Sequence, residues 1–178
     1  MFNARRLLFS ALLAAAVALS ARSAAALPKG DLFAGFSRAG SNIFYPNVPA
    51  LNGWEATGTL RLHKPLLAAE LDVAHYGIGA GSQNPHSTTV LLGPQLAVHG
   101  LGAKFFVHAL VGGEHSKNSA INTPIDGGAF AYALGGGVDL PIAPFFAWRL
   151  QADRLDAPSQ TTANPTKARF TTGIVFRF

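Results

Sequence analysis

Glu114, His115 and Ser116 are consecutive residues in the segment GEHSKNSAIN, and together they supply an acid, a base and a hydroxyl group. A serine hydrolase needs its base within hydrogen-bond distance of the serine, and a third group must orient that base. Adjacent residues of a strand point to opposite faces, so His115 and Ser116 do not face each other in an extended segment. The alternative serine, Ser119, lies in the following loop, and the only other acid nearby is Asp126. We therefore interpret the segment as a transition from strand to loop and predict no catalytic residue.

Two glycine-rich segments, GIGAGS and ALGGGVDL, raise the question of a bound dinucleotide. A dinucleotide-binding loop connects a strand to a helix, whose N-terminus holds the phosphate. Neither segment precedes a helical pattern, so no cofactor is predicted. We expect Gly135 to Gly137 to make room inside the fold, to permit close packing or to allow a bend.

The histidines lack the spacing of a metal site. None of the six is separated from another by two or four residues, and the sequence contains no cysteine. The sequence therefore predicts no metal site and no disulfide. The six are His63, His75, His86, His99, His108 and His115.

The N-terminal segment MFNARRLLFSALLAAAVALSARSAAALP has the three parts of a secretory signal peptide. Arg5 and Arg6 form the positive region, residues 7–21 are apolar, and Ala24 to Ala26 provide the cleavage site. An apolar stretch of 15 residues is short for a membrane-spanning helix. We predict that residues 1–26 are removed and that residues 27–178 form one domain.

The charge of that domain is nearly balanced. The whole chain carries 14 basic and 9 acidic residues, but three of the basic residues lie in the predicted signal peptide, which leaves 11. A clustered basic face is absent from the pattern, so a nucleic-acid partner is not expected. The composition, 49% hydrophobic and only 13% charged, favours a membrane protein over a soluble one.

From residue 30 onward the apolar residues alternate with a period of two, which is typical of β-strands. The connections alternate between long polar segments and short turns, so the long connections gather at one end of an up-and-down sheet. Such a sheet, with an even number of strands about ten residues long, is typical of a transmembrane β-barrel. The eight predicted strands are residues 31–38, 53–63, 66–76, 88–99, 104–115, 128–140, 145–155 and 168–178.

One face of these strands carries charges at mid-strand, and the other is apolar. A barrel of eight strands is just wide enough to be filled by side chains, so we expect the charges to pair inside it and plug the lumen. Charges expected to point outward, Arg38, Lys64 and Arg154, fall at strand ends, where basic side chains reach lipid head groups. The predicted interior charges are Glu55, Arg61, Glu70, Asp72, Lys104, Glu114, Asp139, Arg149, Asp153, Arg169 and Arg177.

The outward aromatic residues gather at two depths, as membrane interfaces favour. Soluble amphipathic barrels and sandwiches show the same alternation, but they do not need these two girdles. The predicted girdle comprises Phe105, Phe146, Trp148, Phe176 and Phe178 at the short-turn end, and Phe36, Trp54, Phe130, Tyr132 and Phe170 at the long-loop end.

The last residues, TTGIVFRF, resemble the C-terminal signature of bacterial outer-membrane proteins, in which an aromatic residue ends the final strand. The segments DLFAGFSR, FFVHALVGGEH, FAYALGGGVDLPI and FFAWRLQADRLD look like strands of the small OmpA-like eight-stranded barrels. The resemblance implies an all-β, eight-stranded, antiparallel up-and-down transmembrane barrel over residues 31–178. It also implies that Phe176 and Phe178 form the signal read by periplasmic chaperones and the barrel-assembly machinery. No peptidoglycan-binding segment follows, so we expect a stand-alone barrel closer in plan to OmpX.

These expectations lead to a non-enzymatic, monomeric outer-membrane protein in contact with lipid, with a structural or surface-interaction role through four exposed loops. The loop composition indicates only that they are polar. A small low-conductance pore is the alternative, because interior charges exclude a wide channel but not a narrow one. A second alternative is a hydrolase like the lipid A deacylases, which some eight-stranded barrels are, with His115 and Ser116 as its candidate residues.

Overall fold

The computed structural model describes residues 29–40, 51–62, 66–78, 86–118, 125–156 and 167–178. The predicted signal peptide, Lys64 and Ser119 lie outside these ranges. In the described part of the chain, no helix is long and apolar enough to cross a membrane. The eight strands are β1 (Gly30–Gly40), β2 (Leu51–Arg61), β3 (Leu67–Ile78), β4 (His86–Gly100), β5 (Ala103–Asn118), β6 (Ile125–Ala143), β7 (Phe146–Asp156) and β8 (Lys167–Arg177).

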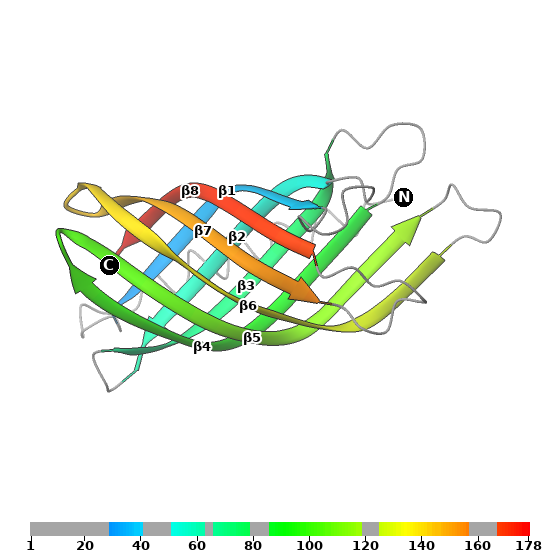
Figure 1. Ribbon diagram of the computed structural model, residues 1–178, viewed down its shortest axis with the longest axis horizontal. Helices are drawn as coiled ribbons and strands as arrows, with labels where there is room; N and C mark the ends of the chain where they lie inside the picture. Colours follow the sequence, from blue (N-terminus) through cyan, green and yellow to red (C-terminus); the bar gives the residue numbers. More distant parts are fainter. Residues whose placement is uncertain (1–28, 41–50, 63–65, 79–85, 119–124, 157–166) are drawn as a thin grey trace, which may run out of the picture.

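These strands form a closed barrel in which each strand is antiparallel to the next, and β1 also pairs with β8 (Figure 1). The β1–β8 seam runs from Asp31 opposite Arg177 to Gly40 opposite Ala168. Gly30 and Phe178 extend it by exchanging two backbone hydrogen bonds of 3.1 Å. Closure leaves none of these eight strands with an unpaired edge. The structure therefore confirms the predicted fold, an eight-stranded antiparallel up-and-down barrel.

The two ends of the barrel differ in the connections that they carry. The long-loop end is where β1, β3, β5 and β7 finish, and the short-turn end is where the β4–β5 and β6–β7 hairpins lie, close to the C-terminus (Figure 1). In the β4–β5 hairpin, Gly100 pairs with Ala103 across a two-residue turn. Both turn residues have positive φ, 52° at Leu101 and 76° at Gly102. This is the conformation that a tight hairpin requires, although Leu101 has a side chain that disfavours it.

The strand bounds differ from the predicted ones by a few residues, most of all in β6. The prediction ended this strand at Leu140, before Pro141, whereas β6 continues to Ala143. The pairing with β7 shifts register between Pro141 and Ala143. A bulge of this kind accommodates a residue without an N–H group, so the proline does not end the strand.

Side chains alternate between the lumen and the outer wall, as β7 shows most clearly, with exposed and buried residues alternating from Phe146 to Leu155. The lumen is not wholly polar, because apolar side chains pack inside it at both ends. One cluster contains Phe33, Ala147 and Val175. A second contains Leu91, Leu110, Ala131, Ala133 and Leu155, and a third Ala39, Ala74 and Tyr76.

Candidate functional site

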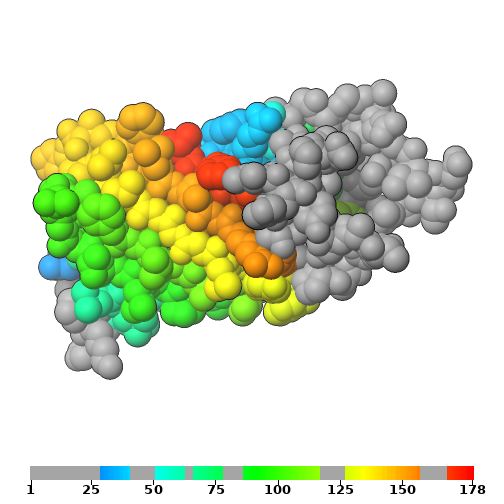
Figure 2. All heavy atoms as spheres, in the orientation of Figure 1, coloured from blue at the N-terminus to red at the C-terminus, as the bar shows by residue number. Residues whose placement is uncertain are grey.

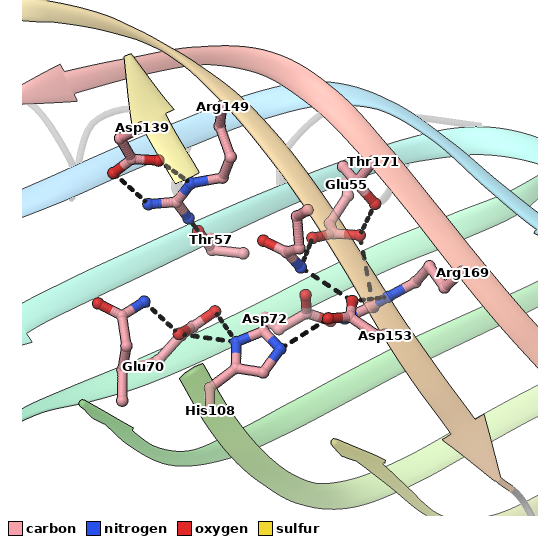
Figure 3. Close-up of polar contacts among 12 residues, drawn as sticks. Glu55, Thr57, Glu70, Asp72, His108, Asp139, Arg149, Asp153, Arg169 and Thr171 are labelled. Atoms are coloured by element: carbon pink, nitrogen blue, oxygen red, sulfur yellow. Dashed lines mark hydrogen bonds and ion pairs between the residues drawn. The ribbon is translucent and has the colours of Figure 1, made fainter. Parts of the chain in front are cut away.

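Between these apolar clusters the lumen holds two groups of buried charges, each built around one arginine (Figure 3). Arg149 and Arg169 are both 0% exposed. A buried guanidinium is tolerated only when acids and hydrogen-bond acceptors surround it. We call the two groups the Arg149 cluster (Asp31, Lys104, Asp139, Arg149 and Arg177) and the Arg169 cluster (Glu55, Glu70, Asp72, His108, Asp153 and Arg169).

Arg149 on β7 binds Asp139 on β6 through two hydrogen bonds. Its Nε lies 2.7 Å from Asp139 Oδ1, and its Nη2 lies 3.0 Å from Oδ2. Nη1 donates to Thr57 Oγ1 at 3.2 Å. The guanidinium also lies over the rings of Phe33 and Phe106, at 5.0 and 4.4 Å from their centroids. A planar cation between two aromatic rings and a carboxylate is held in one orientation.

Lys104 on β5 connects Asp139 to a second acid. Its Nζ binds Asp31 on β1 and lies 3.7 Å from Asp139. Arg177 is less buried, with its side chain 22% exposed, and its Nη2 lies 3.8 Å from Asp139. The sequence prediction did not include Asp31. This residue lies two and six positions before the buried Phe33 and Ser37, so the alternation along the strand places all three on the inward face.

Arg169 on β8 reaches acids on three other strands. Its Nε donates to Asp153 on β7 at 2.6 Å. Its Nη1 donates to Asp72 on β3 at 3.0 Å and lies 3.4 Å from Glu55 on β2. In the sheet, β8 pairs with β1 and β7 but not with β2 or β3. The contacts of Arg169 with Asp72 and Glu55 therefore cross the lumen. Figure 3 shows its side chain extending from β8 towards these carboxylates.

His108 on β5 lies between two acids of the same cluster. Its Nδ1 is 3.1 Å from both Glu70 oxygens, and its Nε2 is 2.8 Å from Asp153 Oδ1. An imidazolium can donate through both nitrogens in this way. In the sequence His108 is an isolated histidine, but it lies an even number of residues after Lys104 on β5, which is the signal that its side chain points inward. Among the described residues, no group of three or more His, Cys, Asp or Glu could hold a metal ion.

Uncharged inward side chains complete the Arg169 cluster. Gln151 Nε2 donates to Glu55 at 3.0 Å and to Asp153 at 2.9 Å. Thr171 donates to Glu55 at 2.8 Å, and Ser37 lies 3.0 Å from Thr171. Gln95 donates to Glu70 at 2.7 Å, and Ser37 also contacts Tyr76 at 3.1 Å. The sequence prediction named only the charges and missed these groups, which add hydrogen bonds to Glu55, Glu70 and Asp153.

Two glycines of the GGG segment make room for the clusters. A Cβ at Gly135 would collide with the Asp153 side chain, and one at Gly137 would lie 2.8 Å from the ring of Phe106. Gly136, between them, faces the outer wall. The inward glycines therefore leave space for the side chains that surround Arg149 and His108.

Two predicted members lie apart from both clusters. Arg61 is exposed, because it is the last residue of β2 and its inward direction opens onto the mouth of the barrel. Including it in the interior network was therefore wrong. Glu114 is buried nearer the long-loop end, where Ser87 and Ser116 donate to its Oε1.

The contacts of Glu114 also bear on the hydrolase candidates. Ser116 Oγ lies 2.9 Å from Glu114, and both side chains face the lumen. His115 is exposed on the outer wall. The structure therefore does not bring His115 to Ser116. The side chain of Asp126 lies outside the described residues, as does Ser119.

On the outer wall, nearly all the predicted girdle residues are exposed, while Tyr132 is half-buried. Phe146 and Phe176 contact each other at 5.5 Å between ring centroids, and Phe176 stacks on Phe178 at 6.3 Å. Arg38 and Arg154 are also exposed, and Arg154 binds Asp156 at 2.8 Å. Large apolar side chains thus cover the wall from one end to the other.

No protein-family model matches this sequence. No curated protein matches it either. Solved structures do match the fold. Neisserial surface protein A superimposes with a TM-score of 0.63 at 10% identity, covering 84% of this chain and 96% of that one. The N-terminal β-barrel domain of OprF from Pseudomonas aeruginosa gives 0.60 at 14% identity, covering 84% and 97%. Ail, the attachment invasion locus protein of Yersinia pestis, gives 0.58 at 12% identity, covering 86% and 100%.

These matches define the class of protein. The chain has the fold of the small eight-stranded outer-membrane β-barrels, which confirms the resemblance seen in its sequence. At 10–14% identity the likeness concerns the fold and not the activity.

Proposed function

We propose that this protein is an outer-membrane barrel whose lumen is closed and whose biological role lies in surface interactions through its four long connections. Fold alone does not determine function, so the proposal depends on what fills the barrel. In a barrel of eight strands, side chains can occupy the whole interior.

The observation that carries the proposal is the set of contacts that Arg169 makes across the lumen. One buried guanidinium lies within 3.4 Å of acids on β2, β3 and β7. An ion moving along the axis would have to separate these pairs, which are excluded from water and held by further hydrogen bonds. Breaking a buried pair costs about 3 to 5 kcal/mol. These costs favour a closed scaffold over the alternative of a low-conductance pore.

The outer wall supports a location in the membrane. Exposed Leu, Val, Ile, Phe and Trp side chains cover it, whereas the charged side chains face inward or lie at strand ends. Lipid of the outer membrane is thus the proposed partner of the wall. A monomer is sufficient, because the closed β1–β8 seam needs no second chain to complete the sheet.

The surface role is supported by the names of two structural neighbours, a surface protein and an attachment invasion locus protein. The proposed assembly partners are the periplasmic chaperones and the barrel-assembly machinery. Their proposed contact is the outward pair Phe176 and Phe178, which stack on each other beside the β1–β8 seam.

Conductance measurement tests the closed lumen. The purified protein, refolded and incorporated into a planar bilayer, should give no stable ohmic steps, while a general porin treated identically gives steps. Incorporation is verified by recovering folded protein from vesicles of the same lipid. Reproducible steps from the folded protein would instead support the pore alternative.

A further inference from the structure

The outer wall has an apolar hollow that crosses β6, β7 and β8, which we call the outer groove. Its volume is about 630 Å³, within the range of pockets that hold small ligands. Figure 2 shows this face of the barrel, with β6 in yellow and β7 in orange between β5 and β8. The residues that line it include Phe36, Arg38, Phe105, Leu150, Ala152 and Phe170.

The strand register explains why the wall is hollow here. Gly136, Ala152 and Phe170 are partners on β6, β7 and β8, and the row continues to Arg38 on β1. Gly136 has no side chain and that of Ala152 is a single methyl group. The outer surface is therefore recessed over β6 and β7 along this row. Elsewhere on the wall, large side chains such as Leu92, Val107 and Phe130 are exposed at many outward positions.

The next row towards the short-turn end forms one side of the groove. Val138, Leu150 and Thr172 are partners on β6, β7 and β8, and the row ends at Phe36 on β1. Thr172 is small, and the aromatic rings of Phe36 and Phe170 border it. The groove therefore runs across the strands, from Phe105 near the start of β5 to Phe36 and Arg38 near the end of β1.

The groove changes character along its length. Its surface is almost entirely apolar, and Arg38, at the long-loop end, is the one charged residue among the described residues that line it. Arg154 lies one row further in the same direction, opposite Ala168. Its side chain is 62% exposed while its Nε binds Asp156 at 2.8 Å. An apolar trough that leads to a guanidinium matches a molecule with a hydrocarbon chain and an anionic head.

We propose that the outer groove binds one acyl chain of an anionic lipid with a phosphate-monoester head from the surrounding leaflet, with the phosphate at Arg38. This inference rests on the proposed membrane location of the barrel. A flexible acyl chain can follow the low floor at Gly136 and Ala152, where rigid packing of neighbouring lipid would leave a void. The arginine then contacts the phosphate as a charge-assisted donor at the interface.

Fluorescence quenching by brominated lipid can test this site. The chain has two tryptophans, so Trp54→Phe leaves Trp148, whose Nε1 donates to the groove residue Thr172 at 2.7 Å. This variant is incorporated into phosphatidylcholine vesicles containing a minor fraction of either dibrominated phosphatidic acid or dibrominated phosphatidylcholine. We expect phosphatidic acid to bind about fivefold more tightly, the effect of one cation near an anionic surface.

Two pairs of variants separate the groove from the rest of the wall. Ala152→Leu should fill the floor and reduce the quenching by both lipids, whereas Arg38→Gln should remove the cation and abolish the preference for phosphatidic acid. Ala34→Leu changes an exposed alanine of β1 outside the groove, and Arg61→Gln removes an exposed arginine at the opposite end. Both of these controls should keep it.

The possible failures are distinguishable. If neither brominated lipid quenches Trp148, the barrel is not in the bilayer and the proposed function itself is wrong. If both lipids quench equally in all variants, only the lipid site is wrong. If Ala152→Leu instead dissociates a dimer seen by sedimentation in detergent, the groove is an interface between two copies, and the inference is overturned.

Discussion

At the scale of single residues, burial determines which arginines matter. Arg149 is fully enclosed and makes three hydrogen bonds, two of them to Asp139. Arg154, five residues later on the same strand, is exposed on the outer wall with Asp156 as its partner. The two side chains carry the same charge and lie on the same strand. They therefore form a matched pair for measuring how much the interior contacts contribute to the free energy of unfolding.

We predict that Arg149→Leu lowers the free energy of unfolding by about 3 to 5 kcal/mol, because Asp139 loses its bidentate partner in the lumen. Arg154→Leu should change it by only ~0 to 1 kcal/mol. Urea titration of the refolded protein in lipid vesicles, followed by tryptophan fluorescence, measures both.

The double variant Arg149→Leu with Asp139→Asn provides the control. Removing both charges should recover part of the lost stability, because residue 139 then carries no buried negative charge that has lost its bidentate partner. Equal urea midpoints for the Arg149 and Arg154 variants would contradict the assigned faces of β7.

At the scale of elements, the β4–β5 hairpin contains a conflict between sequence and geometry. Its turn needs positive φ at both central residues, and glycine or asparagine suits such positions. Leu101 occupies the first of them at φ 52° while its side chain is 100% exposed. The leucine thus adopts an unfavourable conformation without burying its side chain in return.

We predict that Leu101→Asn raises the free energy of unfolding by about 0.5 to 1 kcal/mol, part of the penalty that a β-carbon suffers in the left-handed region. The measurement is the same urea titration. Leu101→Ala serves as the comparison, because alanine keeps the β-carbon without the local hydrogen bonding of asparagine. A gain of equal size from alanine would show that the exposed leucine, and not the turn, was responsible.

At the scale of the whole molecule, the closing seam between β1 and β8 makes the sheet a barrel. Gly35 and Gly173 are partners in this seam. A Cβ at Gly173 would collide with the backbone of Ala34 and Gly35. The two strands can approach each other here because neither residue has a side chain.

We predict that the refolded protein migrates differently on a denaturing gel before and after boiling, since a closed barrel resists detergent until heated. Gly173→Val should abolish the unboiled folded band, because its side chain would block the seam. Gly58→Val on β2 should keep the band, because a Cβ there meets only a leucine methyl at 3.8 Å. Identical mobility of the unmodified protein under both conditions would contradict the barrel.

The sequence alone determined the number of strands and the face of most residues. Both follow from a period of two, which is a local property that the backbone geometry of a strand imposes. The inward position of Arg149 and the outward position of Trp148 could therefore be read without knowing any partner strand. The same alternation places Asp31 and His108 on the inward faces of β1 and β5, although neither was among the predicted interior charges.

Only the tertiary structure decided which inward residues meet. Arg169 binds Asp72, which is 97 positions away, because closure of the barrel and the stagger of its strands bring these two residues to the same height. The same stagger leaves Arg61 at the mouth of the barrel, although the alternation along β2 places Arg61 and Glu55 on the same face. Height along the axis depends on the register of all eight strands together, and the alternation within one strand carries no information about it.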